Sequence, residues 1–224
     1  MAFIITPALK LLLDNLKGPQ FEKNIPYMYV DTVGEVTVGV GHNIDANRDL
    51  LRLPFIVKRF ERHHVIGGDV GIPISNKTAD RPATSAEIQN DYDFLKKHRG
   101  LGKYAADHLQ KYATVELTAS TIDRLFIKDL DISIAVCRRE FGDAFDKFPT
   151  PCQAALIDIA FNCGSFNSFS HLVGAVKGTG AYVKKTLPER WKIAAESCRR
   201  GQVSPLRNAT VAKWFMDGAA LARP

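Results

Sequence analysis

The chain has 224 residues, of which 46% are hydrophobic and 24% are charged, and its formal net charge is +6. This balance excludes a disordered chain and predicts a good buried core, in one large domain or in two lobes. No apolar run approaches the roughly 20 residues of a membrane-spanning helix, so we expect no membrane insertion. The longest basic clusters are pairs such as Lys96 and Lys97, too short for a nucleic-acid-binding arm, although the positive charge suits anionic surroundings.

The first predicted element is a helix over residues 7–17. Pro7 suits the first helical position, and Gly18 followed by Pro19 stops the helix. The start of the chain lacks the positively charged region of a signal peptide. We therefore expect a protein made in the cytoplasm without a recognisable signal peptide.

Residues 27–41 predict a β-hairpin. Tyr27 begins a segment with strand propensity, Asp31 and Gly34 suit the ends of a type I turn, and residues 35–41 alternate as in a half-buried strand. The three valines of this strand share one face, and the other face carries Thr37, Gly39 and Gly41. Because that second face is nearly bare of side chains, we expect it to be open to a ligand at Gly39.

Two acidic residues flank the first strand of this hairpin. Glu22 lies nine residues before Asp31, and Thr37 follows Asp31 by six. Hydrolysis of a glycosidic bond needs a pair of carboxyl groups, one to protonate the leaving oxygen and one to activate water or attack the sugar. A single acid is more often a surface charge, but the spacing, the turn, the threonine and the glycine-spaced strand occur together here. This coincidence favours a catalytic interpretation.

The pattern of Glu22, Asp31 and Thr37, followed by Val-Gly-Val-Gly-His, resembles the phage-type lysozyme (muramidase) family of glycoside hydrolases. The resemblance implies that Glu22 is the general acid, that Asp31 assists the attacking water and that Thr37 helps to place it. It implies an inverting reaction on the β-1,4 bond between N-acetylmuramic acid and N-acetylglucosamine, with no cofactor and no metal. It also suggests a structural role for His42, paired with a carboxylate across the hairpin.

Further segments are similar to the same family. The apolar helix that ends in Phe-Asn-Cys-Gly places Asn162 where the family has an amide beside its cleft, so Asn162 is a candidate sugar contact. Arg207 falls where the family has an arginine near the cleft. The similarities cover roughly residues 18–45 and 115–216. The chain departs from the family at Lys23, where a glycine is usual, and in residues 46–114, which are much longer than the family's link.

The resemblance implies an α+β, lysozyme-like fold in a single catalytic domain, with the active-site cleft between two lobes. The small sheet lobe is expected over residues 18–114 with an extended insertion at 46–114, and the helical lobe over 115–216, joined by the helix at 7–17. Residues 54–82 read as loop and short strand.

Helix ends within the rest of the chain can also be predicted. Thr84 and Glu87 form a capping box, and glycines end the later helices at Gly142 and Gly164. Thr150 is expected to cap the helix that leads to Gly164, and Asn208 to cap the last helix, with a frayed tail at 217–224. The cysteines, Cys137, Cys152, Cys163 and Cys198, are expected to be small buried side chains rather than disulfides or nucleophiles.

The sequence therefore predicts a monomeric peptidoglycan hydrolase, either a phage endolysin or a secreted antibacterial effector, that acts in the periplasm or cell wall of the target bacterium. If it is a toxin, an immunity protein that blocks the cleft is an expected partner. A lytic transglycosylase is an alternative, although such an enzyme needs only the acid. A non-catalytic module that binds the cell wall or a nucleic acid is a third reading, and under the hydrolase reading we expect no nucleic-acid partner.

Overall fold

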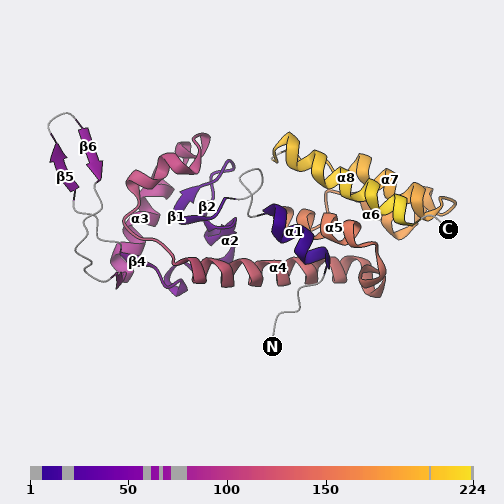
Figure 1. The fold of residues 1–224 in the computed structure, drawn as a ribbon, viewed down its shortest axis with the longest axis horizontal. Helices are drawn as coiled ribbons and strands as arrows, with labels where there is room; N and C mark the ends of the chain where they lie inside the picture. Colours follow the sequence, from indigo (N-terminus) through magenta and orange to yellow (C-terminus); the bar gives the residue numbers. More distant parts are fainter. Residues whose placement is uncertain are drawn as a thin grey trace. The chain divides into compact units, whose positions relative to one another are not determined.

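A computed structural model describes residues 7–16, 23–57, 62–65, 68–71, 80–201 and 203–222 (Figure 1). The structure is mostly helical with a small antiparallel sheet, which confirms the α+β class. The chain divides into two compact units, Asn24–Phe126 and, as the second, Met1–Lys23, Ile127–Pro224. The first unit ends at Phe126, inside the long helix α4 (Ala119–Phe141). Within the described residues, no helix has the length and apolar character needed to cross a bilayer.

The unit Asn24–Phe126 is built on a three-stranded antiparallel sheet in the order β1-β2-β3. Its strands are β1 (Ile25–Val30), β2 (Val36–Gly39) and β3 (His42–Asn43). Thr37 on β2 pairs with Tyr29 on β1 and with Asn43 on β3. The three valines share a buried face, because Val36, Val38 and Val40 are each no more than 2% exposed. The expectation of a half-buried strand is wrong, because Thr37 and Gly39 on the other face are buried too.

Short elements and one longer helix complete this unit. Helix α3 (Ser85–Lys97) begins with the predicted capping box, in which the Thr84 hydroxyl accepts from the Glu87 amide and the Glu87 carboxylate accepts from the Thr84 amide. Residues 54–82 form loop and short strands in their described part, as expected. The remaining elements are α2 (Ile44–Asn47), η1 (Leu50–Arg52), β4 (Ile56–Val57), β5 (Arg62–Val65), β6 (Gly68–Gly71), β7 (Arg81–Pro82), η2 (Arg99–Lys103) and η3 (Ala106–Tyr112).

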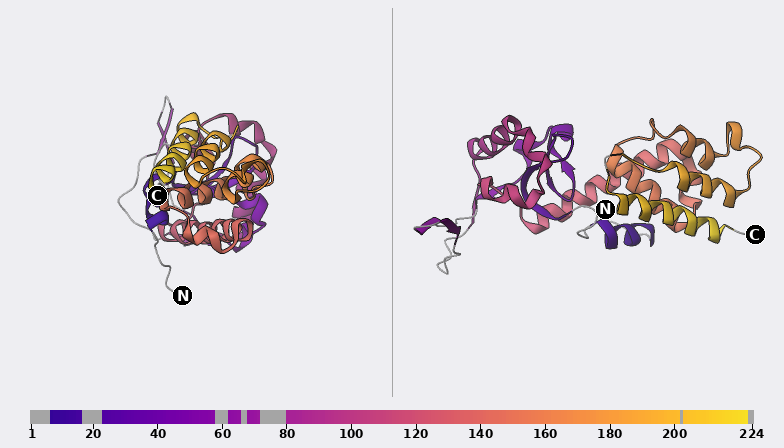
Figure 2. Two further views of the ribbon diagram at one scale, coloured as in Figure 1. Left: turned by 90° about the vertical axis from the view of Figure 1, so that its right-hand side faces the viewer. Right: turned by 90° about the horizontal axis from the view of Figure 1, so that it is seen from above.

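The second unit is a helical bundle around α5 (Thr150–Cys163). Helices α1 (Pro7–Leu16) and α8 (Pro205–Leu221) both pack on α5, and α7 (Leu187–Ser197) packs on α8 and on α6 (Ser170–Lys177). Figures 1 and 2 show α6, α7 and α8 running side by side. Every residue of α5 from 154 to 160 is buried. Two 3-10 turns, η4 (Gly142–Lys147) and η5 (Gly180–Tyr182), join the helices.

Several helix ends follow the sequence and others do not. Helix α4 ends before Gly142 and α5 ends at Gly164, each glycine having a positive φ, as predicted. The expected cap at Thr150 is wrong by one position, because Pro149 is the N-cap and Thr150 is already helical.

The start and end of the last helix also differ from the expectation. Ser204, not Asn208, caps α8, because its hydroxyl accepts from the Arg207 amide at 3.1 Å. The Asn208 side chain instead bonds the backbone nitrogen and oxygen of Arg200, at 3.0 and 2.8 Å. Helix α8 continues to Leu221, so the expected frayed tail at 217–224 is helical over most of its length.

Candidate active site

Asp31 occupies the turn between β1 and β2. The turn closes through a hydrogen bond from the Gly34 amide to the Asp31 carbonyl oxygen, at 3.1 Å. One carboxylate oxygen of Asp31, Oδ1, accepts from the amides of Val33 and Glu35, each at 2.9 Å. In the described part of the chain no hydrogen bond is made to the other oxygen, Oδ2. Two backbone donors thus orient the carboxylate and leave one oxygen for a further partner.

Thr37 lies on β2 and is only 3% exposed. Its hydroxyl oxygen is buried and has no hydrogen-bond partner among the described residues. A buried polar atom without a partner carries a desolvation cost of roughly 1–3 kcal/mol. Thr37 pairs with Tyr29 on β1, and Tyr29 lies two residues before Asp31 in the chain.

Gly39 lies farther along β2, and its surroundings correct the expectation of an open face. The residue is buried, and the Ile122 side chain of α4 packs against it, with Cγ2 3.0 Å from where a Cβ would stand. The side chain of Ile122 therefore covers the strand face at Gly39 that was expected to be open. Gly39 also has a φ of +68°, which itself favours glycine. The proposed sugar contact at Gly39 stays a prediction.

His42 ends the strand segment and is almost fully buried. Its Nε2 lies 3.3 and 3.2 Å from the two carboxylate oxygens of Asp49. A carboxylate partner for His42 is therefore confirmed, but the partner is Asp49, which lies beyond the hairpin in the chain, and not a residue across the hairpin as expected. The contact ties β3 to the residue that precedes η1.

A second polar cluster joins Asp45 to α3. The Asp45 carboxylate accepts from the Val36 amide at 2.9 Å, from the Lys96 ammonium at 2.8 Å and from the Tyr92 hydroxyl. Burial alone would raise the pKa of Asp45, but these hydrogen bonds together hold its pKa well below its usual range. Burial and the Asp45 carboxylate raise the pKa of Tyr92 to about 12. The carboxylate is thus ionised and fixed between β2 and α3.

Glu35 completes this cluster. Its carboxyl group lies within hydrogen-bond reach of the Asp45 carboxylate, and this contact, with some burial, raises the pKa of Glu35. The positive charges of Lys96 and Arg99 oppose the rise. Two neighbouring carboxyl groups therefore differ in proton affinity, Asp45 holding its charge and Glu35 favouring the proton.

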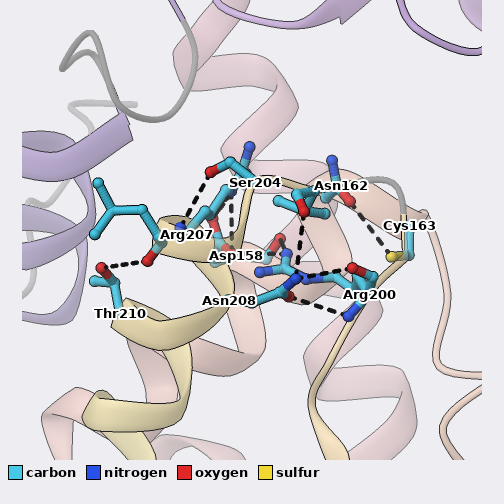
Figure 3. A network of polar contacts seen from close by, with 10 residues as sticks. Asp158, Asn162, Cys163, Arg200, Ser204, Arg207, Asn208 and Thr210 are labelled. Carbon is cyan, nitrogen blue, oxygen red and sulfur yellow. Dashed lines mark hydrogen bonds and ion pairs between the residues drawn. The ribbon is translucent and has the colours of Figure 1, made fainter.

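The helical unit has its own buried charge cluster, drawn in Figure 3. Asp158 of α5 has no exposed surface and pairs with Arg200 at 2.7 Å and with Arg207 at 2.8 Å. Arg207 binds Asp158 through both Nε and Nη2, whereas the Nε and Nη2 atoms of Arg200 find no hydrogen-bond partner among the residues that the structure describes. Both arginines are at most 5% exposed. Among the described residues, the cluster therefore places the Asp158 carboxylate between two buried guanidinium groups.

The predicted sugar contacts Asn162 and Arg207 lie at this cluster (Figure 3). Asn162 is one helical turn beyond Asp158 and is exposed, with the Cys163 thiol 3.7 Å from its side-chain oxygen. Arg207 is 3% exposed and uses two of its nitrogens for Asp158. Because these nitrogens bind a buried carboxylate, at least part of the Arg207 side chain stabilises the fold. Neither contact with a sugar is tested by this geometry, and both stay predictions.

Glu22, the predicted acid, lies outside the described residues. The structure thus brings Asp31, Thr37 and Gly39 together on one hairpin, and it brings Asn162 and Arg207 together in the helical unit. Within the described ranges no group of three or more His, Cys, Asp or Glu side chains is arranged to hold a metal ion.

Asp158, Asp45 and Glu35 belong to polar clusters that were not predicted from the sequence. Asp158 had a usable signal, because a single acid inside the apolar run Ala-Leu-Ile-Asp-Ile-Ala-Phe predicts a buried, paired charge. Asp45 had none, because its partners Tyr92 and Lys96 are about fifty residues away in the chain.

A comparison with models of known protein families and with curated proteins finds no match to this chain.

Proposed function

We propose that this protein is a peptidoglycan hydrolase that cleaves the β-1,4 bond between N-acetylmuramic acid and N-acetylglucosamine. The observation that carries the proposal is the hairpin. One carboxylate oxygen of Asp31 is fixed by two backbone amides, and the following strand carries the buried hydroxyl of Thr37, which has no hydrogen-bond partner among the described residues. A carboxylate and a hydroxyl are the groups that orient an attacking water in an inverting glycosidase. The α+β class is compatible with the lysozyme-like architecture that belongs to this proposal.

The proposed roles follow the chemistry of each group. Glu22 protonates the glycosidic oxygen as the bond breaks, Asp31 accepts a proton from the attacking water, and Thr37 holds that water in line with the anomeric carbon. Asn162 and Arg207 are proposed to lie near the glycan, with the buried Arg207–Asp158 ion pair fixing the arginine. The enzyme would act on the cell wall of a target bacterium, as an endolysin or as a delivered effector with its own immunity protein.

Digestion of purified peptidoglycan, with the products identified by mass spectrometry, tests the proposal. The wild type is expected to release muropeptides with reducing ends. Glu22→Gln is expected to lower the rate by roughly 10²–10⁴-fold, because a positioned general acid contributes about that factor. Asp31→Asn should also abolish most activity, and Thr37→Val should weaken it. Asp93→Asn, an exposed acid on α3, is the matched control and should keep wild-type activity.

The products separate the alternatives. Products with a 1,6-anhydro ring would identify a lytic transglycosylase, and Asp31→Asn would then matter little. Binding to peptidoglycan without any products from the wild type would identify a non-catalytic wall-binding module. NMR of the fresh product anomer distinguishes inversion from retention.

A further inference from the structure

Asp45 reaches Asp31 through a short chain of hydrogen bonds. Asp45 accepts from the Val36 amide at 2.9 Å, so it fixes the first residue of β2. The preceding residue, Glu35, bonds Asp31 twice: its amide donates to the Asp31 carboxylate at 2.9 Å, and its carbonyl accepts from the Asp31 amide at 2.9 Å. A shift of Val36 must therefore move one of the two donors that orient the Asp31 carboxylate.

Helix α3 holds the other side of Asp45. Lys96 and the Tyr92 hydroxyl lie one turn apart on α3 and bind different oxygens of the carboxylate. The Lys96–Asp45 pair is only partly exposed, at 25% and 10% of the two side chains. A partly buried ion pair with a tyrosine hydroxyl as third member is more rigid than an exposed pair.

The segment after α3 approaches the same turn. Gly102 of η2 packs so closely that a Cβ on it would lie 2.1 Å from the Asp31 carbonyl oxygen. Arg99, at the start of η2, passes beside Gly34 of the turn. Residues 92–102 thus contact the Asp31 turn both through Asp45 and directly.

We propose that Asp45 is the positioning residue for Asp31. Because Asp45 raises the pKa of the neighbouring Glu35, we also expect this positioning to vary with pH. The proposal rests on the proposed hydrolase function, in which Asp31 orients the attacking water. Asp45 itself touches no substrate. It acts by holding Val36 and Glu35, which hold Asp31.

The charges around Glu35 give the direction of the pH effect. Glu35 faces Asp45 of α2, Lys96 of α3 and Arg99 of η2, and the Tyr92 hydroxyl lies on Asp45. Because the pKa of Glu35 is raised above its ordinary value of 4.5, the stability that its protonated form contributes is present below that value. That contribution is lost as the pH rises through the raised pKa, when two adjacent carboxylates repel each other. Asp45 works in the opposite sense, and its contribution is lost only in strong acid, as the pH falls through its lowered pKa.

The test is the pH profile of kcat and KM on peptidoglycan for the wild type, Asp45→Asn and Glu35→Gln. Asp45→Asn should lower kcat by at least about tenfold with KM nearly unchanged, because small misplacements of a catalytic group cost up to roughly 10²-fold. Glu35→Gln donates a hydrogen bond at every pH, so it should keep the kcat of the wild type in acid and extend it to higher pH. Asp93→Asn is the control and should match the wild type in both kcat and pH profile.

A second measurement does not depend on activity. The protection of the Val36 and Glu35 amides from hydrogen exchange, measured relative to the intrinsic exchange rate at each pH, should be high in the wild type in acid and fall as Glu35 ionises. In Glu35→Gln this protection should not change over the same pH range. Circular dichroism shows whether each variant is folded, and Tyr92→Phe, which removes one hydrogen bond from Asp45, gives a milder version of the same change. Unchanged kcat in Asp45→Asn, with amide exchange equal to that of the wild type, would overturn the positioning role. An inactive wild type would overturn the hydrolase proposal instead, and the exchange data would still decide whether Asp45 holds the turn.

Discussion

At the scale of single residues, the turn at Asp31 packs closely against the 3-10 helix η2. Gly102 has no space for a side chain, because the Asp31 carbonyl oxygen would lie 2.1 Å from a Cβ. Gly100, in the same 3-10 turn, has nothing within 4 Å of its Cβ position. The same glycine-to-alanine substitution can therefore be made with a clash against the backbone of Asp31, at Gly102, and without one, at Gly100.

Gly102→Ala is expected to push the Asp31 turn away from η2. We expect a loss of roughly 1–3 kcal/mol in the free energy of unfolding, as for other overpacked sites, and a lower rate of peptidoglycan hydrolysis. Gly100→Ala should change neither. Urea denaturation and the hydrolysis assay measure the two effects. Equal stability and equal activity for the two variants would show that the turn does not depend on this contact.

A second residue-scale prediction concerns the buried Asp158. Asp158→Asn removes the buried negative charge that pairs with both Arg200 and Arg207, so it breaks two buried ion pairs at once. Breaking a buried pair in this way costs about 3–5 kcal/mol. Asp146→Asn, which breaks the exposed pair with Arg138, should cost at most about 1 kcal/mol. Chemical denaturation of both variants checks the difference, and similar losses would mean that Asp158 is more hydrated than its burial indicates.

At the scale of elements, the close packing of α8 on α5 depends on Gly218 of α8. Gly218 faces α5, and a Cβ there would lie 2.0 Å from the Cys152 sulfur and 3.5 Å from the Cβ of Pro149. Cys152 is completely buried, so its side chain has little room to move. Gly218 therefore sets how closely α8 lies on α5.

Gly218→Ala sets two effects against each other. Alanine favours the helix by about 1 kcal/mol over glycine, but the clash with Cys152 separates two packed helices, which costs roughly 1–3 kcal/mol. We expect the clash to win and the melting temperature to fall. Adding Cys152→Ala, which removes the sulfur, should recover part of the loss, and Gly201→Ala is a control in open space. If the double variant is no more stable than the single one, Cys152 is not the group that resists the new methyl.

Local signals explain which elements the sequence predicted. The capping box at Thr84 and the glycines after α4 and α5 act within one helical turn, so they are readable from the chain. The cap of α8 was misplaced because Asn208, a good cap by type, is used to bond the backbone of Arg200. The face at Gly39 was misread because its cover, Ile122, comes from a helix more than eighty residues away. Contacts of this range carry no signal in a single sequence.

At the scale of the whole molecule, the α+β class followed from the hairpin and the helical periodicity. The two units share helix α4, which continues without interruption through Phe126 and Ile127. Of the candidate site, the turn at Asp31 and the pairing of His42 with a carboxylate were predictable from local pattern and resemblance. The clusters around Asp45 and Asp158 were not, since each is assembled from separate elements.

The division into units also separates the protein's chromophores. Both tryptophans, Trp191 and Trp214, belong to the unit that contains Ile127–Pro224, whereas five of the six tyrosines belong to Asn24–Phe126. All four cysteines also lie in the tryptophan-containing unit, and of these only Cys163 is exposed. Tryptophan emission and thiol labelling therefore report the opening of one unit, and tyrosine absorbance mainly reports the other. Coincident curves in one denaturation experiment would mean that the two units melt as a single cooperative body, and separate curves would mean that each melts by itself.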